Sequence, residues 1–242
     1  MVVSYQPVLV LLSIAVAIVG SLTALALTSG SHDTEGESWE ASFSLANGGL
    51  IMGTTIWSMH FIAMMAVQFP VLINYNIVET ILSIGIAICA TALGLYVVSG
   101  RRLGSFSIPG AGVLMGLGIG SMHYIGMGAI RGCGLDYDPL LVGASVVIAV
   151  TASMAALWFA FYRRTILTTL AGGVVQGLAI ASMHYTAMAA TFFEPLEAPA
   201  DLTIPLFSQN LLAFMIAGAM LVVCTGNLAL LGFMSMQQRR LV

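Results

Sequence analysis

The stretch SMHYIGMG, at residues 121–128, occurs twice more in closely similar form, as SMHFIAMM at residues 58–65 and as SMHYTAMA at residues 182–189. Each copy places one histidine, a methionine directly before it and a methionine four residues after it in an otherwise apolar run. The three histidines, His60, His123 and His184, are separated by 63 and 61 residues. A fixed internal period of this length indicates a repeated supersecondary unit. The motif therefore predicts a fold built from three similar units.

The composition places these units in a membrane. Of 242 residues, 59% are hydrophobic and 7% are charged, and the mean hydropathy is +1.01. In soluble domains, charged residues make up about a quarter of the sequence. A helix crosses the bilayer in about 20 apolar residues, so we predict an all-α, multi-pass protein with seven transmembrane helices in the lipid bilayer. These helices are expected at residues 7–28, 44–68, 78–99, 107–130, 139–162, 166–191 and 207–234.

Arginine pairs predict the orientation of the helices. The pairs Arg101–Arg102, Arg163–Arg164 and Arg239–Arg240 follow the third, fifth and seventh expected helices. Positive charges next to spans stay on the cytoplasmic side, so we expect the N-terminus outside and the C-terminus in the cytoplasm. Arg131 would then be an exception on the outer side. No basic patch suggests nucleic acid as a partner.

The repeats organise the chain as one transmembrane domain, residues 1–242. Each repeat is a helix pair, at about 7–69, 78–131 and 139–192, and a final helix follows at about 207–234. Two crossings per repeat keep all three copies in one orientation, so the histidines should lie at one depth. With each histidine some eight to ten residues before the outer helix end, that depth is about 12–15 Å.

Glycines recur eleven and seven residues before each histidine; they are Gly49, Gly112 and Gly173, and Gly53, Gly116 and Gly177. At about 100° per residue these glycines share a stripe with the histidine and with the methionine four residues after it. Small residues let membrane helices approach closely. We therefore expect this stripe to pack inward and the three imidazoles to converge.

The converging histidines predict a metal site. A single membrane histidine is often a packing residue and methionine is common core filler, but ionisable groups at this depth are costly and usually functional. Imidazole suits zinc, copper, iron or nickel, whereas thioether sulfur favours copper. We expect one or two copper ions. The predicted ligands are His60, His123 and His184, the preceding Met59, Met122 and Met183, and the following Met64, Met127 and Met188.

The three motifs in a multi-span chain resemble the MHYT domain, a bacterial integral membrane sensory domain named for a repeated Met-His-Tyr-Thr-like motif. The resemblance covers essentially the whole chain. It implies that the motif methionines and histidines bind copper near the outer face of the bacterial inner membrane. It also implies sensing of oxygen, carbon monoxide or nitric oxide for signalling domains. Phe61 replaces the motif tyrosine in the first copy and only Thr186 keeps the threonine, so neither residue type is expected as an obligatory ligand.

Three function classes remain open from the sequence: a copper sensor of a diatomic ligand or of redox state, a copper-handling or delivery protein, and a zinc-dependent seven-helix membrane hydrolase. A hydrolase needs a carboxylate near its metal as general base, and the expected motif helices contain no Asp or Glu, so we expect no enzyme activity. Copper transport would be served by methionines that line a path across the bilayer, whereas the motif methionines lie at one level. The sequence ends in QQRRLV, so we expect either that it signals through a separate cytoplasmic partner or that sensing is not its function.

Overall fold

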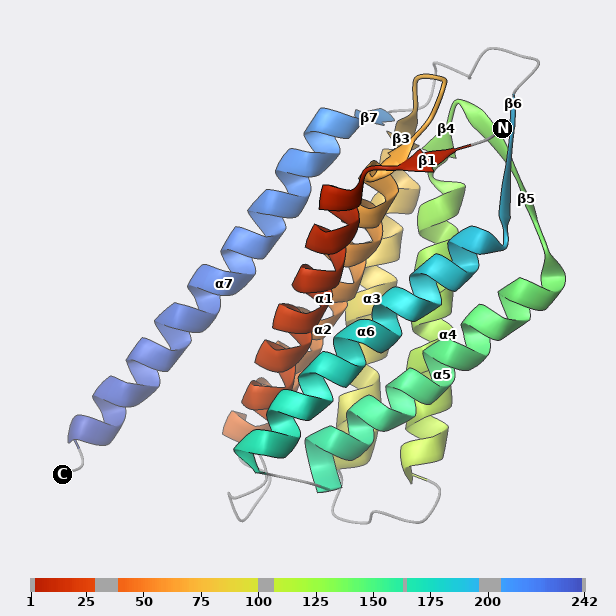
Figure 1. Cartoon of the computed structure of the whole chain (residues 1–242). Helices are drawn as coiled ribbons and strands as arrows, with labels where there is room; N and C mark the ends of the chain where they lie inside the picture. The colour runs from red at the N-terminus through yellow and green to blue at the C-terminus, as the bar shows by residue number, and fades with distance from the viewer. Residues whose placement is uncertain (1–2, 29–38, 100–106, 163–164, 196–205, 241–242) are drawn as a thin grey trace.

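The computed structural model describes residues 3–28, 39–99, 107–162, 165–195 and 206–240, with seven helices in these ranges (Figure 1). They are α1 (Pro7–Thr28), α2 (Trp39–Met65), α3 (Ile77–Ser99), α4 (Ser107–Gly128), α5 (Pro139–Tyr162), α6 (Ile166–Ala189) and α7 (Gln209–Arg240). Six helices, α1 to α6, are long and apolar enough to cross a membrane. In α7 the apolar helix found among described residues is the shorter stretch Gln209–Val223. The prediction of spanning helices is thus confirmed for six, and the C-terminal helix contributes a shorter apolar stretch.

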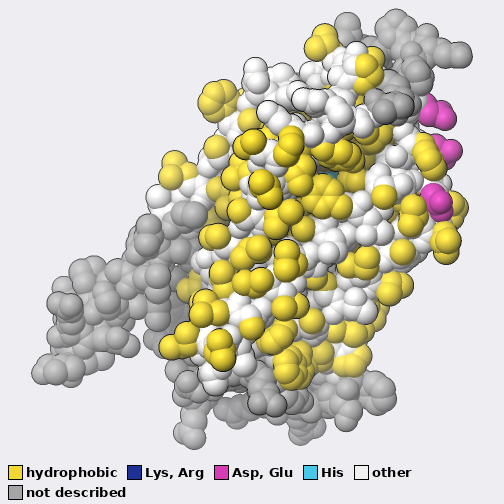
Figure 2. All heavy atoms as spheres, viewed as in Figure 1, with side chains coloured by type: hydrophobic (Ala, Val, Ile, Leu, Met, Phe, Trp, Pro, Cys, Tyr) yellow, Lys and Arg dark blue, Asp and Glu magenta, His cyan; other side chains and the backbone are white. Residues whose placement is uncertain are grey.

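Helices α1 to α6 form a closed ring, because each packs against the next in sequence and α6 packs back against α1. Helix α7 packs against α2 and diverges from the ring toward its C-terminal end (Figure 1). The span of α2 is 89% buried, whereas the other five spans are 33–44% buried. Apolar side chains cover the visible outer face of the ring, and acidic side chains gather near the end that carries the strands (Figure 2). The described face of the ring seen in this view therefore presents lipid-compatible surface between its two ends.

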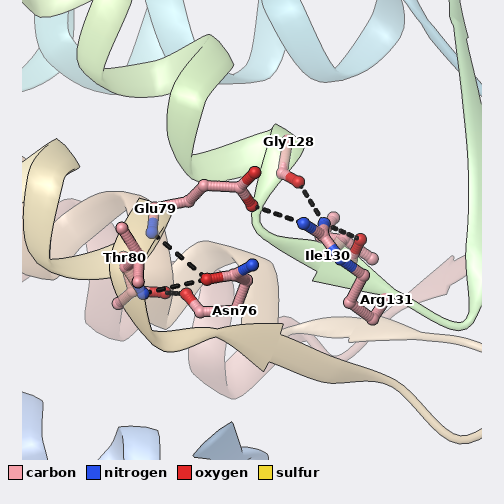
Figure 3. A network of polar contacts seen from close by, with 7 residues as sticks. Asn76, Glu79, Thr80, Gly128, Ile130 and Arg131 are labelled. Atoms are coloured by element: carbon pink, nitrogen blue, oxygen red, sulfur yellow. Dashed lines mark hydrogen bonds and ion pairs between the residues drawn. The ribbon is translucent and has the colours of Figure 1, made fainter. Parts of the chain in front are cut away.

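Local signals explain where the helices begin. Proline is the first residue of α1 and α5, a position that needs no backbone N–H donor. The Asn76 side chain accepts hydrogen bonds from the backbone N–H groups of Val78 and Glu79 at the start of α3, at 2.9 and 3.4 Å (Figure 3). The Asp138 side chain accepts from the Leu140 N–H in the same way at the start of α5. Such caps satisfy donors that a helix leaves unpaired.

Short antiparallel strands join the helices at one end of the ring, a feature that the sequence did not predict. Strand β1 (Ser4–Tyr5) pairs with β2 (Val67–Gln68), and β5 (Cys133–Tyr137) pairs with β6 (Thr191–Pro195). Strand β3 (Asn74–Asn76) lies between β4 (Ile130–Arg131) and β7 (Leu206–Ser208). The strands take up residues directly after α2, α4 and α6, so these helices end earlier than predicted. Each motif histidine lies five residues from its helix end, not eight to ten.

Arg131 has a partner at this same end of the ring. Its guanidinium lies 2.9 Å from a carboxylate oxygen of Glu79 in the first turn of α3, and it also donates hydrogen bonds to the carbonyl groups of Gly128 and Ile130 (Figure 3). A partly exposed pair of this kind contributes about 0–1 kcal/mol. Arg131, which is not part of an arginine pair, thus connects the end of α4 to the start of α3. The side chains of the three arginine pairs lie outside the described residues, so the orientation stays a prediction.

The repeated glycines bring helix backbones into contact, but in a direction that differs from the prediction. A Cβ atom placed on the glycine seven residues before each histidine would lie 2.5 Å from a Cα atom of the next repeat's first helix. The pairs are Gly53 with Ile88 of α3, Gly116 with Val150 of α5, and Gly177 with Ile18 of α1. The glycine stripe therefore faces the neighbouring helix in the ring instead of its centre. It closes the ring with approximate threefold symmetry.

Candidate metal centre

The three motif histidines meet inside the ring. Their ring centroids are 4.8, 5.1 and 5.2 Å apart, with an edge-to-face arrangement in every pair. One nitrogen from each imidazole lies within 4.8 Å of the others, and the Nδ1 atoms of His60 and His184 are 3.2 Å apart. All three side chains are at most 1% exposed. The predicted convergence is confirmed, since α2, α4 and α6 run in the same direction and each carries its histidine at the same distance from its end.

Four nitrogen atoms of this cluster have no hydrogen-bond partner: Nε2 of His60, Nε2 of His184, and both nitrogens of His123. Buried polar atoms are normally paired, since leaving them unpaired costs free energy. A metal held at bond lengths of about 2.0–2.1 Å places its tetrahedral or trigonal ligands about 3.3–3.6 Å from each other. The separation of the His60 and His184 nitrogens is close to this value, and a nitrogen of His123 lies within 4.8 Å of both rings' donors. The donor set fits a metal ion.

The six motif methionines surround the histidines in sequence and are all buried, with at most 3% of each side chain exposed. The methionine before each histidine lies about 100° around the helix on one side, and the methionine four residues later lies about 40° around on the other. The three imidazoles form a group that could hold a metal ion. The methionines remain predicted ligands.

A glycine makes room for one of the imidazoles. A Cβ atom on Gly126 would lie 2.5 Å from Nε2 of His60. The equivalent positions in the other repeats, three residues after the histidine, are Ala63 and Ala187. The cluster is therefore only approximately threefold, and His60 leans toward α4. The sequence shows Gly126, but it does not show that the imidazole of His60 occupies the space beside this glycine.

The aromatic residue after each histidine connects the centre to the next repeat. The hydroxyls of Tyr124 and Ser145 are hydrogen-bonded at 2.7 Å, and those of Tyr185 and Ser13 at 2.9 Å. Each tyrosine ring also contacts its neighbouring histidine ring edge-to-face, with centroids 5.0 Å apart. The motif tyrosine therefore holds the imidazole against the adjacent helix. This role requires no bond between tyrosine and a metal.

In the first repeat, a different residue donates a hydrogen bond to the equivalent serine. Phe61 has no hydroxyl, and the indole N–H of Trp57 donates to Ser83 at 3.1 Å. The ring of Phe61 still contacts that of His60, with centroids 4.7 Å apart. Ser13, Ser83 and Ser145 all donate to the carbonyl three residues earlier in their helix. The three serines are thus equivalent acceptors for a donor from the motif helix.

Sequence reasoning missed a second layer of aromatic rings. Tyr5, Tyr75 and Tyr137 each stand two residues before a repeat's first helix and eight residues before its serine. Their rings contact Tyr185, Phe61 and Tyr124 with centroids 6.4, 5.8 and 5.5 Å apart. Each histidine is therefore followed by two aromatic rings in a row toward the strand end. The constant spacing between this tyrosine and the serine was the signal in the sequence that could have predicted the second layer.

Burial keeps these outer phenols neutral. Loss of solvent, with smaller effects of Tyr124 and Cys133, raises the pKa of Tyr137 to about 12. Burial also raises the pKa of Tyr75, and Cys133 adds to the effect. The side chain of Tyr75 is fully buried and its hydroxyl has no hydrogen-bond partner. The strand end of the centre is thus closed by uncharged rings.

Comparison with known families agrees with this geometry. A family described as bacterial signalling protein N-terminal repeat, MHYT, matches residues 1–39, 53–110, 116–173 and 177–242. The chain belongs to the MHYT family. The matched segments run through all three histidine motifs and the glycines that close the ring. The buried three-histidine cluster is therefore a feature of an MHYT domain that repeats its motif three times.

Several named bacterial proteins share this MHYT region. The chain is 42% identical to the bifunctional diguanylate cyclase/cyclic di-GMP phosphodiesterase MucR of Pseudomonas aeruginosa over 78% of its length. It is 35% identical to the signaling protein YkoW of Bacillus subtilis over 81%, and 34% identical to the cyclic di-GMP phosphodiesterase NbdA of Pseudomonas aeruginosa over 77%. The aligned part is 24–28% of the length of these relatives. No solved structure significantly matches the chain.

Proposed function

We propose that this MHYT chain is a copper-containing sensory domain that detects oxygen, carbon monoxide or nitric oxide, or a change of redox state, on behalf of a bacterial signalling protein. The observation that carries the proposal is the buried cluster of three imidazoles with four unpartnered nitrogens. A charged metal ion in an apolar interior needs several donors at once, and the cluster supplies them. The names of the relatives, which are signalling proteins, support the sensory part.

Copper is proposed in preference to zinc because of the methionines. Zinc is satisfied by imidazole nitrogen, whereas thioether sulfur selects copper, above all Cu(I). Two buried methionines per repeat lie within one helical turn of each histidine. We propose one or two ions, with Met59, Met122 and Met183 as the first candidates among the sulfur ligands.

We propose no catalytic role for the centre. Among the described residues, the group that can hold a metal contains imidazoles and no carboxylate. The described carboxylate of Glu79 is paired with Arg131 at the ring end. Helix α2 begins at Trp39 and so includes Glu40, contrary to the expected bounds, but twenty residues of helix, about 30 Å, lie between Glu40 and His60. Water activation on zinc would lack a nearby general base.

Copper delivery is the second candidate, and one observation favours it. Met52 and Met115, each eight residues before a histidine, line a small apolar cavity about 12 Å from the cluster along the helices. The equivalent residue in the third repeat is Gln176, which is buried with both polar atoms unpartnered. A path for copper would require a second layer of soft donors, such as these methionine sulfurs, at another depth along the helices. The sensor remains the better proposal, because Ile56, Ile119 and Ile180 stand between the two levels.

The proposed topology places the N-terminus and the strands outside, the C-terminus in the cytoplasm, and the centre in the outer half of the inner membrane. It rests on the arginine pairs. A topology reporter fused after Thr28 should report a cytoplasmic position, and one fused after Pro199 an external position. The opposite result at both sites would move the centre to the cytoplasmic half. A separate or attached cytoplasmic signalling domain would receive the signal.

The metal proposal is tested by elemental analysis of the purified protein. We expect about one or two copper ions per chain and little zinc. After reduction, carbon monoxide should give an infrared band for a cuprous carbonyl, and nitric oxide should change the spectrum. Copper that binds neither gas and passes to an acceptor protein would favour delivery instead. Zinc in place of copper would overturn the sensor proposal.

A further inference from the structure

A lipid-facing groove lies between α4 and α5, in the half of the ring that carries the motif histidines. Its walls come from both helices: Leu117, Gly120, Ser121, Tyr124 and Ile125 of α4, and Val142 and Val146 of α5. Most of the lining is aliphatic, with one hydroxyl and one phenol, and none of it is charged. The groove opens sideways from the ring rather than at its ends. Its environment is therefore the hydrocarbon part of the bilayer.

The groove exists because residue 120 has no side chain. A Cβ atom on Gly120 would have one neighbour, Cγ2 of Val146, at an ordinary contact distance of 3.8 Å. This differs from Gly116, one turn away, where a Cβ atom would lie 2.5 Å from the backbone of Val150. Gly116 is needed for helix packing, whereas Gly120 leaves space that packing does not require.

The other repeats fill the equivalent position. It is occupied by Trp57 in the first repeat and by Ala181 in the third, each three residues before the motif histidine. The indole of Trp57 is 1% exposed and is fixed by its hydrogen bond to Ser83. The second repeat thus has space where the first has the largest side chain available. This difference gives the approximately threefold centre one side with easier access.

One aromatic ring both lines the groove and contacts the histidine cluster. Tyr124 lines the groove, and its ring centroid is 5.0 Å from that of His123. The Tyr124 hydroxyl is hydrogen-bonded to Ser145 on the opposite helix, so the phenol crosses the inner end of the groove. His123 is the histidine whose two nitrogens both lack a partner. A small molecule in the groove would therefore be close to the least satisfied imidazole.

We propose that this groove is the lateral entrance by which an uncharged diatomic ligand passes from the bilayer to the His123 side of the centre, with the Tyr124 ring as the barrier it must pass. The inference rests on the proposed function. Apolar molecules prefer the bilayer and the aliphatic walls to water, while hydrated ions are excluded from both. The entrance selects for small, uncharged ligands before they reach the metal.

The test compares substitutions that fill the groove with one that does not. Gly120→Phe adds a ring where the first repeat has Trp57, and Gly120→Val adds a smaller side chain. Gly110→Leu is the matched control, since Gly110 is an exposed glycine of α4 with nothing within 4 Å of its Cβ position and no part in the groove. Copper content is measured first, and the variant of Gly120 that retains full copper is used. The probe is carbon monoxide, rebinding to the reduced protein after flash photolysis.

We expect the association rate for carbon monoxide to fall about tenfold or more in the Gly120 variant, with copper content and the carbonyl infrared frequency unchanged. Gly110→Leu should rebind at the wild-type rate. Tyr124→Phe, which loses the hydrogen bond to Ser145, should rebind faster. Equal rates in wild type and the Gly120 variant would overturn the entrance.

A probe that needs no metal separates this inference from the proposed function. If the wild-type protein binds no carbon monoxide, the sensor proposal fails, and xenon then tests the groove alone. Xenon, an uncharged apolar atom, should bind between α4 and α5 in wild type and in Gly110→Leu but not in the Gly120 variant. Absence of xenon from the wild-type groove would overturn the entrance.

Discussion

The first and second repeats carry the same histidine at the same depth but enclose it differently. In the first repeat Phe61 follows the histidine, Trp57 fills the space beside it, and α7 packs against the motif helix. In the second repeat Tyr124 follows the histidine and Gly120 leaves a groove. Repetition thus specifies where the donors lie, and the residues around the motif decide how each donor can be reached.

The largest expected effect tests whether the histidines are equal despite these surroundings. His60→Ala and His123→Ala should each remove most of the bound copper, because two imidazoles hold an ion far less well than three donors arranged around it. Elemental analysis of detergent-purified protein is the measurement, with helical circular dichroism as the control for folding. If a folded triple variant that also lacks His184 keeps its full copper content, the metal lies elsewhere.

Glycine packing gives the next largest effect, and it should be the same in both repeats. In Gly116→Leu and Gly53→Leu the new side chain meets the backbone of Val150 or Ile88, since even a Cβ atom would be 2.5 Å from their Cα atoms. The motif helix must shift, and overpacking of this kind costs about 1–3 kcal/mol. We expect copper loss with normal membrane insertion, measured by metal content and membrane fractionation. Full copper occupancy in Gly116→Leu would show that the ring tolerates displacement of α4.

Exchanging the motif aromatics has a smaller effect, on stability. Phe61→Tyr adds the hydroxyl that is paired with the equivalent serine in the other two repeats, but Trp57 already donates to Ser83. An unpaired buried hydroxyl costs about 1–3 kcal/mol, so the thermal unfolding midpoint should fall. Adding Trp57→Phe frees the serine for the new tyrosine and should recover much of the loss. If the double variant is no more stable than Phe61→Tyr alone, the two donors do not share one acceptor.

The smallest expected effect concerns the outer tyrosines. Burial raises the pKa of Tyr137 to about 12, above the usual value of about 10. The neutral phenol is the form that the fold favours, so its contribution to stability is complete below about pH 10 and is lost as the pH rises toward 12. An ultraviolet titration should show a late phenol step that Tyr137→Phe removes, while the fully buried Tyr75 stays neutral beyond it. Ionisation of Tyr137 near pH 10 would show that its ring is open to water.

Much of the fold follows from local sequence. Apolar runs of about 20 residues located α1 to α6, with starts within a residue or so for α1, α3, α4, α5 and α6, because hydrophobic length and helix-starting residues act over short distances. The equal depth of His60, His123 and His184 followed from two crossings per repeat. Their convergence therefore required only that the motif helices share the interior.

The tertiary structure decided what lies beside each motif. The glycine stripe faces the next helix in the ring, Arg131 pairs with Glu79, and Tyr137 contacts Tyr124 only because the ring closes in this order. The strands of two to five residues depend on partners far away in the sequence. Helical periodicity shows which residues share a face, but not which neighbour that face meets, because the neighbour is chosen by packing among distant segments. For this reason the sequence by itself determined the histidine donors, and the fold alone revealed the open side of the centre at Gly120.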